Sequence, residues 1–218
     1  MPHEAADAAA AFPLASVLEN EDDLRAVYRR PRDTVVAKNI HQIDDHFRRF
    51  IGLSPFLCMG TTGADGRGDT TPRGGEPGFV HVLDSTHLAM PDRPGNNRID
   101  SLVNIVERPG VGLVFLIPGF EDALRVNGTA RITTDEALMS RFIVDGKPPL
   151  TVIVITVHEA YLHCGKAVRR AGLWDAASQV DRGTFPSAGQ IYRDQLTLDA
   201  PVAAIDEVLD KDLRDTLY

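Results

Sequence analysis

The sequence predicts a mainly β fold with peripheral helices, organised as a six- to seven-stranded antiparallel barrel that is closed or half-closed. Strand-sized apolar segments occur in pairs joined by short turns rich in Gly and Asp. One short helix separates the second pair from the third, and the strand–helix alternation of a parallel sheet is not seen. With 218 residues, of which 43% are hydrophobic, the chain is long enough to bury a core.

Two helices are expected before the first strand. Asn20 precedes three acidic residues, which is typical of an N-cap and a first helical turn, and Pro31 marks the end of this helix. Apolar residues spaced three and four apart between Ile40 and Ile51 predict the second helix, with Gly52 as its C-terminal cap. Residues 1–19 are rich in Ala and unpatterned, and we expect them to form a loose arm.

Two hairpins should follow. Phe56–Thr62 and Asp69–Arg73 are strand-like and flank the turn sequence Gly63-Ala64-Asp65-Gly66. Phe79–Leu83 and His87–Met90 form the second pair, joined through Asp84-Ser85.

The middle of the chain predicts one helix and two long strands. Asn96 or Asn97 is expected to cap a helix that ends at Arg108-Pro109-Gly110. Val111–Ile117 is apolar throughout, as in a strand covered on both faces, whereas residues 124–132 alternate between apolar and polar.

The last part of the barrel and a helical extension complete the prediction. Thr133 and Glu136 have the spacing of a capping box for a helix over 134–143, and Thr151–His163 is the final strand. Helices are expected over 166–174 and 190–196, and a terminal amphipathic helix between 205 and 217. We therefore divide the chain into an N-terminal arm and helix (1–35), a barrel domain (36–174) and a C-terminal helical extension packed on the barrel (175–218).

Composition narrows the possible partners. The net charge of -8 argues against a surface for nucleic acid or anionic lipid, and no apolar run reaches the roughly 18 residues that a membrane-spanning helix needs. The first residues lack the pattern of a secretory signal, and Cys58 and Cys164 are too few for a disulfide framework, so we expect a cytoplasmic protein. His41 and His46 have the wrong helical spacing to share a metal, and no metal site is expected.

The first candidate anion site is the segment Thr70-Thr71-Pro72-Arg73-Gly74-Gly75. Hydroxyl groups, an arginine fork and accessible backbone N–H groups suit an oxyanion or a phosphate. The alternative is an ordinary polar strand end with a solvated arginine.

The second candidate is Asp92-Arg93-Pro94-Gly95-Asn96-Asn97-Arg98, which leads directly into a predicted helix. The unpaired N–H groups and the positive dipole at a helix N-terminus favour an anion, and the Asn and Arg side chains add donors. Alternatively, the two arginines pair with Asp92 and Asp100 in a capped loop.

The third candidate is the basic run from His163 to Arg170, in which Lys166, Arg169 and Arg170 could meet an anion. The alternative is a solvated helix face. Cys164 could be a nucleophile, but a buried inert thiol is the simpler interpretation.

In order and spacing, these segments resemble the flavin-binding split barrel of the pyridoxamine 5′-phosphate oxidase family. The resemblance runs from about Phe47 to Trp174, and is strongest to a bacterial branch marked by Pro-Asp-Arg-Pro-Gly-Asn-Asn-Arg and His-Cys-Gly-Lys-Ala. The matching segments are Pro55–Thr61, Thr71–Arg73, Pro91–Arg98, Arg108–Phe115 and Leu124–Arg131.

The resemblance implies a homodimer with two FMN molecules at the subunit interface. Arg73, beside Thr71, matches the family's first phosphate-binding arginine, and Asn97 and Arg98, with Asn96 beside them, match the second phosphate contact. Pro91, Asp92 and Arg93 would follow the edge of the isoalloxazine ring. Lys166 and Arg169 would come from the other subunit, and Arg125 would tune the ring or meet a small-molecule substrate.

The resemblance thus implies an FMN-dependent oxidoreductase and leaves its substrate open. Gly74-Gly75-Glu76-Pro77-Gly78 replaces the longer basic signature of the vitamin oxidase, and the C-terminal substrate-binding Arg and His pattern is missing. A non-catalytic flavin-binding protein, or the same fold with a deazaflavin or haem, are the alternatives.

Overall fold

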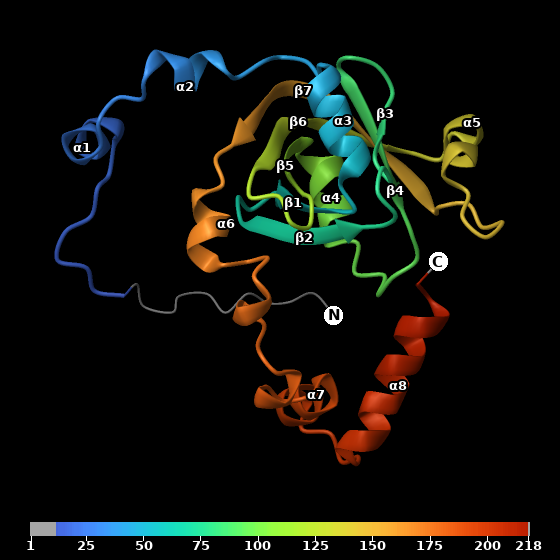
Figure 1. Cartoon of the computed structure of the whole chain (residues 1–218). Coiled ribbons are helices and arrows are strands. Elements are labelled where there is room, and N and C mark those ends of the chain that lie inside the picture. Colours follow the sequence, from blue (N-terminus) through green and yellow to red (C-terminus); the bar gives the residue numbers. More distant parts are fainter. Residues whose placement is uncertain (1–11, 218) are drawn as a thin grey trace. The chain divides into compact units, whose positions relative to one another are not determined.

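A computed structural model describes residues 12–217 of the chain, which divides into two compact units, residues 1–37 and 38–218 (Figure 1). Of the arm expected over residues 1–19, the first eleven residues lie outside the described part. The boundary expected at 174/175, and the packing of residues 175–218 on the barrel, stay predictions.

The first unit contains two short helices. Helix α1 (Glu21–Val27) begins as predicted, because the Asn20 side chain accepts a hydrogen bond from the Asp23 N–H at 3.0 Å. Helix α2 (Asp33–Ala37) was not predicted. Neither helix buries a residue.

The second unit is built on one seven-stranded sheet in which every neighbouring pair is antiparallel, as the sequence predicts. The order is β2-β1-β5-β6-β7-β4-β3, so β2 and β3 are the two edges. The strands are β1 (Phe56–Thr62), β2 (Gly68–Gly74), β3 (His81–Val82), β4 (His87–Asp92), β5 (Gly110–Leu116), β6 (Ala123–Thr133) and β7 (Thr151–His163).

One apolar core lies against this sheet, because alternate residues of the central strands point to the same side. Leu57, Phe115, Leu124 and Val126 are fully buried. Residues 111–117 were predicted to be covered on both faces. In the structure one face of β5 is buried and the other, with Val114, is only half-buried. The pairing of β6 with β7 shifts register between Asn127 and Gly128, which is a β-bulge.

Helix α3 (Asp45–Leu53) begins later than the apolar spacing predicts. Ile40 is extended and pairs with Ala160 through backbone hydrogen bonds of 3.0 and 2.7 Å. The helix starts after Asp44, whose side chain accepts from the Phe47 N–H at 2.8 Å. Gly52 lies inside the helix, so the predicted glycine cap was wrong.

Helix α4 (Asp100–Glu107) lacks the predicted asparagine cap. Ile99 occupies the N-cap position with φ 51° and makes no side-chain cap. The Asn96 side-chain oxygen Oδ1 instead accepts from the Arg98 N–H at 3.1 Å, inside the preceding loop. Helix α4 packs against β1, β2 and β6, which places its first turn beside β2.

The remaining helices are shorter than predicted or shifted. Helix α5 (Glu136–Met139) and the 3-10 turn η1 (Ser140–Phe142) follow Asp135, which is the N-cap in place of Thr133. Helix α6 (Lys166–Ala171), the 3-10 turns η2 (Ala176–Ser178) and η3 (Arg182–Thr184), α7 (Ala188–Leu196) and α8 (Val202–Asp215) complete the chain, and α7 packs against α8. None of the helices within residues 12–217 is long and apolar enough to cross a membrane.

The turn between β3 and β4 gives a pH-dependent prediction. The Thr86 N–H donates to Asp84 at 2.7 Å, and together with the neighbouring His87 it lowers the pKa of Asp84 from 3.8 to about 2. Because the folded pKa is the lower one, this carboxylate stabilises the fold above about pH 4, and the contribution disappears as pH falls through 2. An NMR titration of the Asp84 carboxyl carbon should show this midpoint, and a midpoint near 3.8 would contradict the assignment.

Candidate functional site

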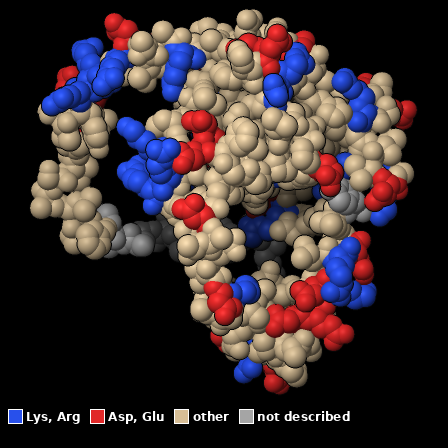
Figure 2. Space-filling model, viewed as in Figure 1, with Lys and Arg blue, Asp and Glu red and all other residues tan. Residues whose placement is uncertain are grey.

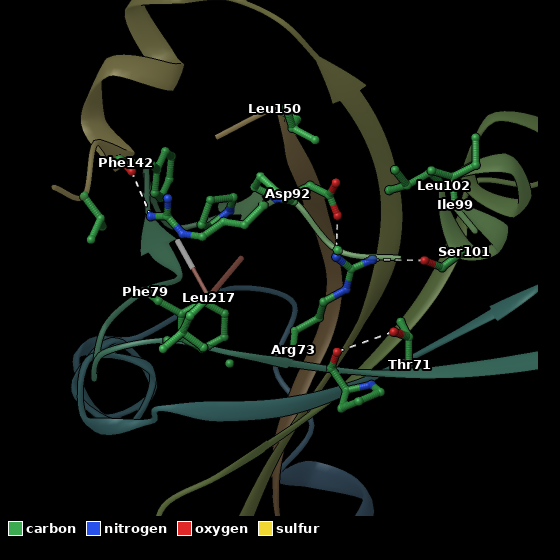
Figure 3. A pocket seen from close by; sticks show the side chains of 18 of the residues that line it. Thr71, Arg73, Phe79, Asp92, Ile99, Ser101, Leu102, Phe142, Leu150 and Leu217 are labelled. Atoms are coloured by element: carbon green, nitrogen blue, oxygen red, sulfur yellow. Dashed lines mark hydrogen bonds and ion pairs between the residues drawn. The ribbon is translucent and has the colours of Figure 1, made fainter. Parts of the chain in front are cut away.

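A cavity of about 1020 Å³ is lined by residues of both edge strands, β2 and β3. It therefore lies where the sheet does not close on itself, and Figure 3 shows part of its lining. Its walls come from β2 and the following turn, from the first residue of β3, from the end of β4 and the loop after it, from the start of α4, and from the segment after α5. The lining includes Thr71, Arg73, Phe79, His81, Pro91, Asp92, Arg93, Asn96, Asn97, Arg98, Ser101, Arg141, Phe142 and Leu217.

The Arg73 side chain is far more enclosed than that of Arg98 in the same cavity, 18% against 67% exposed. Strand β2 presents it toward β4, where one Nη atom forms an ion pair with Asp92. The other Nη atom donates to Ser101 Oγ at 3.0 Å, and Nε is buried without a hydrogen-bond partner. The side chains of Arg73 and Asp92 are 18% and 12% exposed. The pair therefore links the edge strand β2 to β4, the strand next to the other edge.

The first turn of α4 adds a second group of donors. Ile99 and Asp100 line the cavity, and no side chain caps the helix, so the positive end of the helix dipole lies beside the cavity. Arg98 lies just before the helix, is largely exposed and pairs with Asp100 at 2.8 Å. Asn97 adopts φ 58°, which turns the loop toward the helix.

The opposite wall carries an aromatic pair. The rings of His81 and Phe142 are stacked with centroids 4.1 Å apart, and Arg93 donates to the Phe142 carbonyl oxygen at 2.8 Å. Burial, and secondarily the charge of Arg141, lowers the pKa of His81, so the imidazole is neutral at pH 7. This wall thus combines two stacked rings with the guanidinium group of Arg93.

Eight of the eleven predicted cofactor residues gather in this cavity: Thr71, Arg73, Pro91, Asp92, Arg93, Asn96, Asn97 and Arg98. The other three do not line it. The Arg125 guanidinium lies 5.1 Å from the ring centre of Tyr161, and Arg169 binds Glu121 through contacts of 2.6 to 3.0 Å. Lys166 begins α6. Lys166 and Arg169 were predicted to serve the partner's site, and that stays a prediction.

The Glu121–Arg169 pair holds α6 against the turn that joins β5 and β6. Hydrogen bonds from Arg169 lower the pKa of Glu121, and the Trp174 indole N–H donates to the Phe120 carbonyl at 2.7 Å. The predicted interpretation of the third basic run as a solvated helix face therefore omitted an anchoring role. Cys164 is exposed rather than buried.

Sequence reasoning missed Ser101, His81 and Phe142 as site residues. Ser101 sits in the first turn of the predicted helix after the Asn-Asn-Arg loop, and that position could have indicated it. His81 and Phe142 are 61 positions apart, and no local pattern indicates their contact. Among residues 12–217, no group of His, Cys, Asp and Glu could hold a metal ion.

The model of the pyridoxamine 5′-phosphate oxidase family matches residues 43–164, more than half of the chain. The chain belongs to this family. The match contains the whole sheet and the whole group of eight residues, and it ends before α6. No curated protein matches the chain.

Several solved structures are similar to parts of the chain. HupZ of Group A Streptococcus is 19% identical, with 55% of this chain and 93% of HupZ covered and a TM-score of 0.46. A protein of Clostridium acetobutylicum related to general stress protein 26 is 16% identical, with 56% and 91% covered and a TM-score of 0.41. An F420 reductase is 16% identical, with 56% and 98% covered and a TM-score of 0.39.

Proposed function

We propose that this protein is an FMN-dependent oxidoreductase acting on a small molecule, with the flavin bound at a homodimer interface and its phosphate in the cavity between β2 and β4. The convergence of Arg73, Arg98 and the first turn of α4 on one cavity carries this proposal. Membership of the pyridoxamine 5′-phosphate oxidase family supports the flavin. The free thiols of Cys58 and Cys164 are compatible with the cytoplasm as the compartment.

The donor set fits the phosphate of FMN. A phosphomonoester carries close to two negative charges and accepts several hydrogen bonds. Arg73 supplies a largely buried guanidinium with one N–H lacking a partner, Arg98 supplies a second cation, and the uncapped helix supplies backbone N–H groups. The Asn97 side chain adds a neutral donor.

The other predicted residues have distinct positions in the proposal. Pro91, Asp92 and Arg93 follow the ring edge, and the Asp92 side chain also reaches Arg73 at the phosphate end, where Thr71 and Asn96 lie. Arg125 meets the ring or the substrate, and Lys166 and Arg169 come from the partner subunit. A bound flavin supplies two-electron chemistry, so the protein has to bind and orient it and needs no side-chain nucleophile.

Native mass spectrometry tests the proposal most directly. We expect two chains with two FMN molecules, and an absorbance band near roughly 450 nm, which belongs to the flavin itself. Arg98→Ala should reduce flavin occupancy, whereas Arg67→Ala, at an exposed arginine in the β1–β2 turn, should not. A deazaflavin or haem in the spectrum would replace FMN in the proposal, and a single chain without cofactor would refute it.

Turnover separates an enzyme from a flavin carrier. After photoreduction of the bound flavin, a panel of small-molecule electron acceptors should reoxidise it faster than buffer does. Reoxidation at the rate of buffer alone with every acceptor would favour the non-catalytic flavin-binding protein.

A further inference from the structure

The cavity contains a counter-ion for Arg73, whose side chain is mostly buried. Arg73 on the edge strand β2 and Asp92 at the end of β4, the strand next to the other edge, contact each other, and both side chains are mostly buried. Ser101 binds the second amino group of the same guanidinium. The positive charge of Arg73 is therefore neutralised within the chain, and only its Nε lacks a hydrogen-bond partner.

The cavity lining has a net formal charge of zero from its arginines and acidic residues. It contains four of each: Arg73, Arg93, Arg98 and Arg141, and Asp69, Glu76, Asp92 and Asp100. Asp100 is about half exposed, so water screens its charge, whereas the Asp92 carboxylate is mostly removed from water and acts at shorter range in a lower dielectric. Asp92 therefore opposes a bound anion more strongly than Asp100 does.

Main-chain hydrogen bonds fix the backbone at Asp92, and the carboxylate is not needed for this. Asp92 pairs with Thr151 in the β4–β7 ladder, and its carbonyl oxygen accepts from the Leu150 N–H at 2.9 Å. The end of β4 is thus fixed by main-chain hydrogen bonds. The side chain is available for a role in ligand selection.

We propose that Asp92 is a specificity-determining residue, which pairs with Arg73 and sets how strongly the cavity favours a phosphorylated ligand. This inference rests on the proposed function in that FMN is the expected ligand. A phosphate that reaches Arg73 has to compete with the Asp92 carboxylate for the same guanidinium, and it is repelled by that carboxylate when bound. A ligand without a phosphate meets neither effect.

The experiment compares FMN with riboflavin, which shares the ring and ribityl chain and lacks the phosphate. Asp92→Asn keeps an oxygen acceptor for Arg73 and removes the charge. We expect it to tighten FMN binding at least about tenfold and to change riboflavin binding less than about twofold, as measured by quenching of flavin fluorescence. Asp65→Asn removes an equal charge at an exposed carboxylate in the β1–β2 turn, outside the cavity, and it should leave the ratio of the two affinities unchanged.

Inorganic phosphate gives a readout that does not depend on flavin binding. By calorimetry, Asp92→Asn should bind phosphate more tightly than the natural chain, and Asp92→Ser should do the same if the Asn variant does not fold. Weaker or unchanged phosphate binding, or equal changes for FMN and riboflavin, would overturn the inference. Failure of the natural chain to bind either flavin would instead refute the proposed function, with the phosphate result still deciding the role of Asp92.

Discussion

Arg73→Ala is expected to lower both the stability of the fold and its affinity for FMN. The substitution leaves the Asp92 carboxylate mostly buried without its ion-pair partner, which typically costs about 3–5 kcal/mol. It also removes a charge-assisted contact to the proposed phosphate, worth about 1.5–3 kcal/mol, or roughly 10- to 100-fold in affinity. Urea denaturation and flavin titration measure the two effects separately.

The double variant Arg73→Ala/Asp92→Ala distinguishes the two causes. Removing both charges abolishes the unpaired carboxylate, so most of the lost stability should return, since replacing a whole buried pair is often nearly neutral. Affinity for FMN should stay below that of Asp92→Ala alone, because the guanidinium is still missing. If the double variant bound FMN as tightly as Asp92→Ala does, Arg73 would act only through the fold, and its assignment as a phosphate contact would be wrong.

Gly128→Ala is expected to destabilise the barrel strongly. Gly128 lies at the β-bulge between β6 and β7, where a Cβ atom would stand 2.1 Å from the Thr156 carbonyl oxygen. The neighbouring atom belongs to the backbone of the adjacent strand, so it cannot rotate away and the ladder itself has to move. We expect a loss of about 3 kcal/mol or more in the free energy of unfolding, at the upper end of the cost of overpacking.

Gly68→Ala is the matched control, since Gly68 also lies in a strand and no atom lies within 4 Å of the position of its Cβ. Its free energy of unfolding should stay within about 0.5 kcal/mol of the natural chain. Equal effects of the two substitutions in urea denaturation would show that the close approach at Gly128 is relaxed at little cost.

Local sequence patterns predict the strands well, because each strand carries its own signal. The boundaries of β1 and β7 match the expected segments, and the alternation in residues 124–132 matches the buried and half-buried faces of β6. On the face shown in Figure 2, acidic and basic side chains are interspersed.

Helix ends were predicted less accurately, because several residues compete for each cap. Asp135 caps α5 where Thr133 was expected, and Asp44 caps α3 in a segment read as already helical. At α4, Asn96 binds within its own loop, which leaves Ile99 at the cap. Which of several neighbouring polar side chains caps a helix depends on the path of the preceding loop. The sequence pattern does not contain that path.

By itself, the sequence determined the class of fold, the order of its strands along the chain and the two segments that carry the candidate anion contacts, because hydrophobic periodicity, turn residues and arginine-rich loops are local properties. Only the tertiary structure decided that Arg73 meets Asp92 and Ser101, that His81 stacks on Phe142, and that Arg125 lies against Tyr161. These contacts join residues on different strands and helices. They exist because the sheet brings its two edges to one cavity, and that closure depends on the packing of the whole core.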